Sequence, residues 1–392
     1  MASEKENKSI DSLIKELSKK YANNSLAMKA SVVPTFKRIP SKALGLTYVT
    51  YGGFAEGTID EISGEEHSGK TSVACLMIAD CQRKYPDKIC VYIDIECLLD
   101  VQFQAVQNGI DLDRLYYVKP TMMSGEQICD MAVDFLKNPQ VGVVVLDSLP
   151  AMVPQIVWES DLVDDKGMRA SMARKLHLFL PMAKSIVSEN SSQLVLINQT
   201  RDEQKNFGGK TLIVKKETCG SAAKFYSDTI IRCGKRTFTL EDEMDYCGKG
   251  KDAGEGADGY RIKFKIIKNK TAKVSRGGGF ITYRYATGID YLHDALEIAI
   301  TFGFIQKLTA NGRYALVNLN TGEVFVDENG EEIKGYKAYI LNYLYNHKDF
   351  CEAYINDLTK HITESNDSYG VLIDTSDIDA EQASIDANEV NE

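Results

Sequence analysis

The residues with the clearest chemical meaning form the run Gly64–Thr71, which reads GEEHSGKT and matches the pattern G-x-x-x-x-G-K-[ST]. In this pattern the glycines let main-chain N–H groups curl around phosphate oxygens, the lysine reaches the β- and γ-phosphates, and the hydroxyl binds Mg²⁺. A strand pattern over 57–62 precedes the run and a helical pattern over 71–84 follows it, so a helix dipole points at the same anion. The sequence therefore predicts a site for ATP and Mg²⁺, with Lys70 and Thr71 at its centre.

Three further apolar strands end in polar side chains that suit the hydrolysis of ATP. The β-branched run over 141–146 ends at Asp147, which can hold the Mg²⁺ shell. A second strand leads into Asp94 and Glu96, and we expect Glu96 to orient the attacking water. The alternative is that one of these two acids caps the next helix. A third strand ends at Gln199, whose amide can hydrogen-bond the γ-phosphate and report its presence.

Two segments without a clear apolar period follow these strand ends. Thr200–Lys224 carries six Lys or Arg residues against three acids, and a structureless loop of that length is usually functional. Its basic character next to Gln199 suits a nucleic-acid contact governed by ATP. Pro154–Gly167 contains Trp158, the only tryptophan, and both segments should emerge on the same edge of a parallel sheet. The alternative is that both are ordinary surface loops, with Trp158 packed against the body.

The elements that must position these residues alternate between strand and helix, which predicts an α/β fold with a mostly parallel sheet covered by helices on both faces. Strands are expected over 57–62, 89–93, 115–118, 141–146 and 193–197, and helices over 71–84, 125–136 and 168–188. Later strands over 228–233, 260–267 and 280–285 have short connections and are expected to be antiparallel at one edge, with a surface loop over 247–259. The predicted division is an N-terminal helix and linker (1–41), an ATPase core (42–289), a small α+β C-terminal domain (290–363) and an acidic disordered tail (364–392).

Both ends of the chain have a distinct character. Apolar residues recur at helical spacing from Ile10 to Tyr21, which predicts an amphipathic helix that packs either on a neighbouring subunit or on its own domain. Residues 364–392 hold nine acids and no Lys or Arg, so the net charge of −10 becomes −1 without them (46 basic against 56 − 9 = 47 acidic residues). The tail either competes with nucleic acid for basic surface or only keeps the protein in solution.

The composition excludes several classes of protein. Hydrophobic residues make up 44% of the chain, and no apolar run approaches the roughly 20 residues that span a bilayer. The N-terminus lacks the apolar stretch of a secretory signal. The nine cysteines are scattered and never form C-x-x-C, which argues against a zinc module or a disulfide framework and for reduced thiols in the cytoplasm.

Taken together, these strand ends resemble the RecA family of DNA recombinases, and its bacterial and phage branch in particular. The likeness runs from about Ile10 to His361 and includes GSAAKFY at 220–226 and KIIKNKTA at 265–272. The bacterial and phage branch is favoured over the archaeal and eukaryotic relatives because the small domain follows the core. The resemblance implies a RecA-like core with an N-terminal arm that packs on the next subunit. It further implies ATP bound at a subunit interface that the partner's copies of two lysines complete.

The resemblance also assigns roles to individual residues. For ATP binding it implies Glu65, Glu66, His67, Ser68, Gly69, Lys70, Thr71, Ser72, Asp100, Phe103 and Tyr285. For catalysis it implies Lys70, Glu96, Gln199, Lys268 and Lys270, and for Mg²⁺ it implies Thr71 and Asp147. For DNA contacts it implies Trp158, Met168, Arg169, Arg201, Phe207, Lys210, Gly220 and Ser221, while Lys224 and Phe225 match interface positions.

The sequence departs from the family pattern in the DNA-contacting segments. Ser221 stands where the bacterial proteins usually have Asn, Thr200–Lys224 is a few residues longer than usual, and the stretch around Glu241–Gly259 is enlarged. None of these departures touches the ATP chemistry.

As the resemblance implies, we expect a DNA-dependent ATPase that forms a helical filament on single-stranded DNA and drives homologous pairing and strand exchange with duplex DNA. Mediator and single-strand-binding proteins are the partners that such a filament would meet. The competing hypotheses are another RecA-fold motor, such as a hexameric helicase or a clock-type ATPase, and a P-loop small-molecule kinase.

Overall fold

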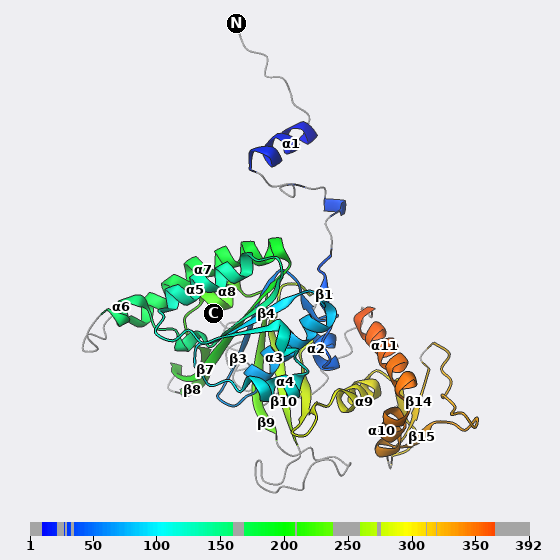
Figure 1. The fold of residues 1–392 in the computed structure, drawn as a ribbon. Helices are drawn as coiled ribbons and strands as arrows, with labels where there is room; N and C mark the ends of the chain where they lie inside the picture. Colours follow the sequence, from blue (N-terminus) through cyan, green and yellow to red (C-terminus); the bar gives the residue numbers. More distant parts are fainter. Residues whose placement is uncertain are drawn as a thin grey trace. The chain divides into compact units, whose positions relative to one another are not determined.

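The computed structural model describes residues 10–21, 27, 30–32, 35–159, 168–207, 210–237, 259–272, 276–310, 312–318 and 320–364. For 168–170, 202–207, 210–216 and 235–237 the description covers the backbone alone. Contacts divide the chain into two compact units, Met1–Lys37 and Arg38–Glu392, whose elements are labelled in Figure 1. The predicted fourfold division of the chain remains a prediction.

The larger unit is built on a ten-stranded sheet with the order β12-β11-β10-β9-β3-β7-β6-β4-β5, to which β8 adds by pairing with β7. The six strands from β9 to β5 in this order are all parallel. Their bounds are Thr58–Gly64 (β3), Ile89–Asp94 (β4), Leu115–Val118 (β5), Val141–Asp147 (β6), Gln193–Phe207 (β7) and Thr229–Thr237 (β9). The predicted mostly parallel α/β core is confirmed.

The sheet is apolar on both faces because helices cover both faces. In β6, Val143 and Val145 join the hydrophobic core on one side, while Val144 and Leu146 join the core on the other. This alternation explains the unbroken apolar run in the sequence. Figure 1 shows α2 (Leu44–Val49), α3 (Lys70–Lys84) and α4 (Val101–Asn108) on one face, and α5 (Gly125–Lys137), α7 (Met168–Asn190) and α8 (Ala222–Tyr226) on the other.

Three strands close one edge of the sheet in antiparallel fashion. They are β10 (Gly259–Asn269), β11 (Gly278–Arg284) and β12 (Gly288–Ile289). The antiparallel part begins one strand later than predicted, because β9 pairs in parallel with β3 and only its pairing with β10 is antiparallel. The buried run Thr229–Cys233 lies beside β3 in the interior of the sheet, which its apolar residues Ile230 and Ile231 allow.

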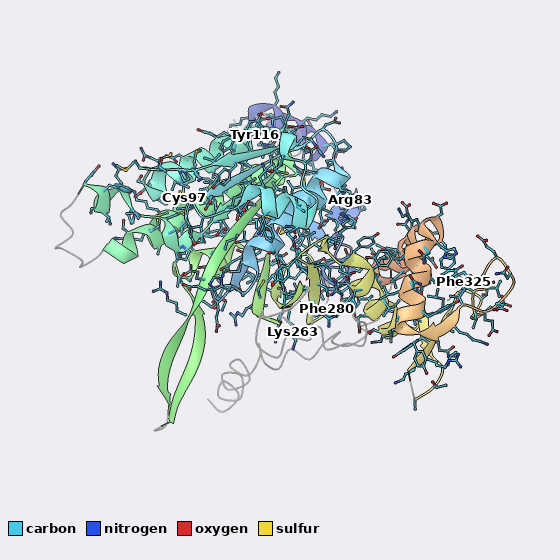
Figure 2. All side chains as sticks on the ribbon, turned by 60° about the horizontal axis from the view of Figure 1, so that its bottom comes forward. Arg83, Cys97, Tyr116, Lys263, Phe280 and Phe325 are labelled. Atoms are coloured by element: carbon cyan, nitrogen blue, oxygen red, sulfur yellow. The ribbon has the colours of Figure 1, made fainter. Side chains whose placement is uncertain are left out.

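The segment that follows Gln199 is not the structureless loop that we predicted. β7 continues as far as Phe207, and β8 (Lys210–Glu217) returns antiparallel to it, with Thr200 opposite Glu217 and Phe207 opposite Lys210. The resulting β7–β8 hairpin extends beyond the body of the sheet (Figure 2). This ribbon forms although its sequence has no alternation of apolar and polar residues, because main-chain hydrogen bonds between the two strands need none.

The C-terminal elements share the core of the parallel sheet. Their bounds are Tyr291–Thr301 (α9), Ile305–Lys307 (β13), Arg313–Leu316 (β14), Lys334–Tyr336 (β15), Lys337–Asn346 (α10) and Lys348–Glu364 (α11). Phe302, Leu344 and Leu358 belong to the same hydrophobic cluster as Leu76 on α3. The guanidinium of Arg276 donates hydrogen bonds to the main-chain oxygens of Tyr48 and Ile362, at 3.0 and 2.9 Å, and so ties α11 to the end of α2.

The smaller unit contains the helix α1 (Ile10–Lys20) and a 3₁₀ turn over Ala30–Val32. The predicted N-terminal helix is therefore present, and it buries none of its own residues within this chain. Arg38–Ile39 (β1) and Phe54–Ala55 (β2) form a separate two-stranded pair at the start of the larger unit. The predicted loop 247–259 lies, apart from Gly259, outside the described residues, and so does the tail beyond Glu364. No helix in the part of the chain that the structure describes is long and apolar enough to cross a membrane.

Candidate nucleotide site and the segments around it

A cavity of about 550 Å³ lies at the carboxyl ends of β3, β4, β6 and β7. Its lining residues are Glu66, His67, Gly69, Lys70, Thr71, Ser72, Asp94, Glu96, Leu98, Leu99, Asp100, Gln104, Asp147, Ser148 and Gln199. The fold thus brings together polar residues that lie more than 130 positions apart in the sequence. Parallel strands make this possible because all of their carboxyl ends meet at one edge.

The phosphate loop contains a glycine in a backbone conformation that other residues rarely adopt. Gly69 has a φ of +90°, and a Cβ on it would lie 2.3 Å from Cδ1 of Ile262. Directly after it α3 begins at Lys70, whose Nζ donates a hydrogen bond of 2.5 Å to the main-chain oxygen of Glu65. The hydroxyl of Ser68 donates to the same oxygen at 2.8 Å. Burial lowers the pKa of Lys70 from its ordinary value.

The predicted metal-binding pair is in contact. The hydroxyl of Thr71 donates to Oδ2 of Asp147 at 3.1 Å, and the hydroxyl of Tyr92 donates to the same oxygen. Burial raises the pKa of Asp147 to about 6, although the Tyr92 hydrogen bond acts in the opposite direction. A hydroxyl and a carboxylate are the hard oxygen ligands that Mg²⁺ prefers, so the residues present fit that ion.

The two acids after β4 have separate surroundings. Asp94 accepts hydrogen bonds from the main-chain N–H groups of Cys97 and Leu99, both at 2.8 Å, and from the hydroxyl of Tyr117 at 2.7 Å. It therefore holds the loop that follows β4, and the alternative that one of these acids caps the next helix is wrong, because Asp100 caps α4. Both acids line the cavity, but Glu96 is bonded to a different set of partners.

Around Glu96 the cavity contains two further polar partners. Oε1 of Glu96 accepts a hydrogen bond from the Ser148 hydroxyl, and Nε2 of Gln199 lies 3.5 Å from the same oxygen. Ser148 follows Asp147 through a cis peptide bond. Glu96, the predicted water-orienting residue, and Gln199, the predicted phosphate sensor, are thus neighbours. Ser148 contacts Glu96 as well.

Three of the residues that the resemblance assigned to ATP binding are only partly at the cavity. Asp100 lines it and caps α4 by accepting a 2.9 Å hydrogen bond from the N–H of Phe103. The rings of Phe103 and Tyr285 are 42% and 41% exposed and are not part of the lining. Tyr285 lies beside Tyr260, with 5.7 Å between ring centroids.

Sequence reasoning missed four lining residues. These are Leu98, Leu99, Gln104 and Ser148. Ser148 carried a usable signal, because it directly follows the predicted metal-binding acid at the strand end. Leu98 carried none, since an exposed leucine in a loop looks the same as any other until the fold places it at a site.

Lys268 and Lys270 lie away from the cavity of their own chain. Lys268 donates to the main-chain oxygens of Lys224 and Phe225, at 2.5 and 3.1 Å, and Lys270 donates to that of Phe225 at 3.2 Å. Neither lysine lines the cavity. Phe225 beside them is 67% exposed.

The predicted DNA-contacting residues are spread over the short helix α6 (Gln155–Trp158), α7, the β7–β8 hairpin and the turn that follows it. Trp158 ends α6 and is 46% exposed, so it is not packed into the body. Arg201 is exposed on β7, Gly220 has a φ of +79° at the base of the hairpin, and Ser221 precedes α8. Met168 and Arg169 begin α7. Phe207 is the last residue of β7, and Lys210 is the first residue of β8. The side chains of these four residues lie outside the described part of the structure.

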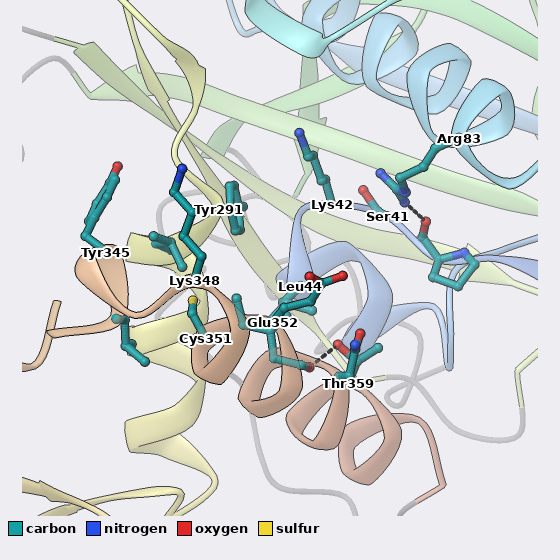
Figure 3. Close-up of a pocket in the computed structure, with 15 residues that line it drawn as sticks. Ser41, Lys42, Leu44, Arg83, Tyr291, Tyr345, Lys348, Cys351, Glu352 and Thr359 are labelled. Carbon is teal, nitrogen blue, oxygen red and sulfur yellow. Dashed lines mark hydrogen bonds between the residues drawn. The ribbon is translucent and has the colours of Figure 1, made fainter. Parts of the chain in front are cut away.

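A second cavity, of about 670 Å³, is lined by α2, α3 and the C-terminal helices (Figure 3). Lys42, Tyr291 and Lys348 are among its lining residues, and Arg83 there donates to the main-chain oxygen of Pro40. It contains none of the strand-end residues, so we place the chemistry in the smaller cavity.

The sequence is similar to known proteins over most of its length. The family model for the RecA N-terminal domain matches residues 8–290. Protein RecA of Aquifex aeolicus is 30% identical over 84% of this chain and 87% of its own length. Protein RecA of Chlorobaculum parvum is 30% identical over 80% of this chain and 85% of its own length. Protein RecA of Bacteroides thetaiotaomicron is 28% identical over 87% of this chain and 99% of its own length.

Proposed function

Since this chain belongs to the RecA family, we propose that it is a DNA-dependent ATPase that forms filaments on single-stranded DNA. In that state it catalyses homologous pairing and strand exchange in recombination and DNA repair. The observation that carries the proposal is the meeting of the phosphate loop, Asp147, Glu96 and Gln199 in one cavity, directly at the root of the β7–β8 hairpin.

Each group in the cavity supports a distinct task in hydrolysis. The main-chain N–H groups of the phosphate loop and Lys70 hold the β- and γ-phosphates, and Thr71 with Asp147 holds Mg²⁺. When bound, Mg²⁺ neutralises charge that develops on the transferred phosphoryl group. Glu96 orients the attacking water and accepts its proton, while the Ser148 hydroxyl keeps the carboxylate in place.

The change from ATP to ADP reaches the DNA through Gln199. Its side chain faces the cavity, and its main chain continues directly into the hairpin that carries Arg201. A γ-phosphate contact at Gln199 therefore favours the hairpin geometry that binds DNA, and hydrolysis removes that bias. Basic residues on the hairpin then follow the DNA backbone with little sequence preference.

The site is completed by a second copy of the chain. Lys268 and Lys270 do not line their own cavity but lie beside Phe225, which is exposed. In a filament they supply positive charge to the ATP of the neighbouring protomer, as an arginine finger does.

The test is an ATPase assay with Mg²⁺, with and without single-stranded DNA, together with electron microscopy in the presence of a slowly hydrolysed ATP analogue. We expect DNA to stimulate hydrolysis and open helical filaments to appear. Closed rings alone would assign the chain to another RecA-fold motor, and phosphate transfer to a small molecule without DNA would assign it to a kinase.

Two matched variants make the assay specific. Lys70→Ala should abolish nucleotide-dependent assembly and ATPase activity. Lys42→Ala removes the same side chain from the second cavity and should leave both unchanged. ATPase activity of wild-type size in Lys70→Ala would overturn the site.

A further inference from the structure

Asn198, the residue before Gln199, uses every hydrogen-bonding position of its side chain. It is completely buried in β7. Its Nδ2 donates to Oε1 of Glu61 at 2.8 Å and to the main-chain oxygen of Thr218 at 3.2 Å. Its Oδ1 accepts from the Thr218 hydroxyl and from the N–H of Gln199, both at 2.9 Å. A primary amide offers two donors and two acceptor positions, so its capacity is filled.

The partners of Asn198 come from three parts of the sheet. Glu61 lies in β3, the strand that leads into the phosphate loop, and Thr218 directly follows β8 at the return of the hairpin. Thr218 also donates from its N–H to the main-chain oxygen of Gln199 at 3.0 Å. Both sides of the Gln199 backbone are therefore tied to Asn198 or Thr218, while only its side chain is free to follow the contents of the cavity.

The surroundings of Glu61 explain why an amide stands opposite it. Glu61 is completely buried, and its Oε2 has no hydrogen-bond partner among the described residues. Glu217 and Arg232 form an ion pair nearby, and burial raises the pKa of Glu61 to about 7. A carboxylate at position 198 would face this acid without an N–H to donate, and an apolar residue would leave buried polar atoms unpaired.

We infer that Asn198, Thr218 and Glu61 form a positioning unit that fixes Gln199 to the base of the β7–β8 hairpin. Through this unit a contact made by the Gln199 side chain moves the hairpin as a whole and not the side chain alone. The inference rests on the proposed function, because it assumes that Gln199 senses the γ-phosphate. Asn198 and Thr218 touch neither nucleotide nor DNA in this account.

The structure offers a closely matched pair of variants. Thr218→Val removes the hydroxyl that bonds to Asn198, with little change of shape. Thr200→Val makes the same change on the other side of Gln199, at a buried hydroxyl that has no hydrogen-bond partner within the described residues. Thr218→Ser keeps the hydroxyl and serves as the rescue.

The measurement compares the Kd for a fluorescent single-stranded oligonucleotide with and without a slowly hydrolysed ATP analogue. The Kd without the analogue divided by the Kd with it measures the coupling between the two sites. We expect Thr218→Val to lower the ratio about 5- to 10-fold, as the loss of one buried hydrogen bond predicts. The Kd for the ATP analogue in the absence of DNA should stay within about 2-fold, since the phosphate loop is untouched. Thr200→Val and Thr218→Ser should keep the wild-type ratio.

Three outcomes would overturn the inference. They are an unchanged ratio in Thr218→Val, an equal fall in Thr200→Val, or failure of Thr218→Ser to restore the ratio. If Thr218→Val melts at a much lower temperature than the wild type, Asn198→Asp tests the same unit from the amide side. It too must lower the ratio. If the wild type shows no ATP dependence of DNA binding, the proposed function fails first, and the two failures are thereby distinguished.

Discussion

At the residue scale, Glu96 and Asp94 stand two positions apart but have different tasks. Asp94 accepts hydrogen bonds from two N–H groups of the turn that follows it and from the hydroxyl of Tyr117 on β5, so it shapes the loop that carries Glu96. Glu96 keeps an oxygen toward the cavity, where it meets Ser148 and Gln199. A general base needs a free lone pair at the reacting water, and only Glu96 has this freedom.

We therefore predict that Glu96→Gln retains ATP binding but loses turnover. The amide oxygen still accepts from Ser148, whereas the basic group is gone, so kcat should fall by about 10²- to 10⁴-fold. Single-turnover hydrolysis with single-stranded DNA and a separate nucleotide-binding titration measure the two effects. Asp94→Asn is the contrast, because it loses one acceptor for three donors and should lower the melting temperature. Turnover of wild-type size in Glu96→Gln would show that another group activates the water.

At the element scale, the helix α6 is short and exposed compared with the buried strand β6 that precedes it. The helix α6 has no buried residue, and Trp158 at its end is 46% exposed, in the segment that follows the strand carrying Asp147. If this helix contacts DNA, the environment of the indole changes on binding.

Trp158 therefore offers a direct spectroscopic test. As the only tryptophan, it should change its fluorescence intensity or emission maximum when single-stranded DNA is added with an ATP analogue. Trp158→Phe supplies the background signal, and Trp158→Ala should weaken DNA binding by about 1–3 kcal/mol if the indole stacks on a base. A silent tryptophan in a titration that reaches saturation would remove α6 from the DNA interface.

Asp294, at the junction between β11 and α9, is a buried acid whose protonation affects stability. Asp294 is completely buried and accepts hydrogen bonds from the N–H and hydroxyl of Thr282, at 3.0 and 2.6 Å. Burial raises the pKa of Asp294 to about 7, against about 3.9 in an unfolded chain. Between these values the folded state holds a proton that the unfolded state has released, so stability falls as the pH rises and then levels off above 7.

Asp294→Asn should remove this dependence and stabilise the protein at pH 8 relative to the wild type, by at most about 4 kcal/mol. The measurement is the difference in melting temperature between pH 5.5 and pH 8, which should be smaller in the variant. Asp134→Asn, at a side chain that is 73% exposed, is the control and should behave like the wild type. Equal pH dependence in all three proteins would contradict the assignment.

At the scale of the whole molecule, the active site is divided between two copies of the chain in our proposal. The phosphate loop and Lys268 with Lys270 then act in different protomers, which permits a complementation test. Lys70→Ala lacks the first half, and the double variant Lys268→Ala, Lys270→Ala lacks the second.

We predict that each protein alone has little DNA-stimulated ATPase activity, whereas an equal mixture has more than the sum of the two. In the mixture, some interfaces combine the intact phosphate loop of the double variant with the intact lysines of Lys70→Ala, and these interfaces hold a complete site. The double variant mixed with itself at the same total concentration is the control. A mixture no more active than its components would place the lysines outside the neighbour's site.

The sequence by itself determined the local chemistry of this protein. The phosphate loop, the acids and amide at the strand ends and the alternation of strand and helix are all written in residues close together, whose hydrogen bonding and burial depend on neighbours in the chain. That is why the elements of the core were predictable to within a few residues, and why the four strand ends could be expected to meet.

Tertiary structure decided what depends on residues far apart in the chain. It separated Glu96 from Asp94, because only the position of Ser148 and Tyr117 shows which acid is free. It converted the expected loop after Gln199 into a hairpin, since strand pairing between polar segments leaves no apolar period to read. It placed β9 in parallel beside β3 and moved Lys268 and Lys270 away from their own cavity, because strand order is set by packing across the whole sheet.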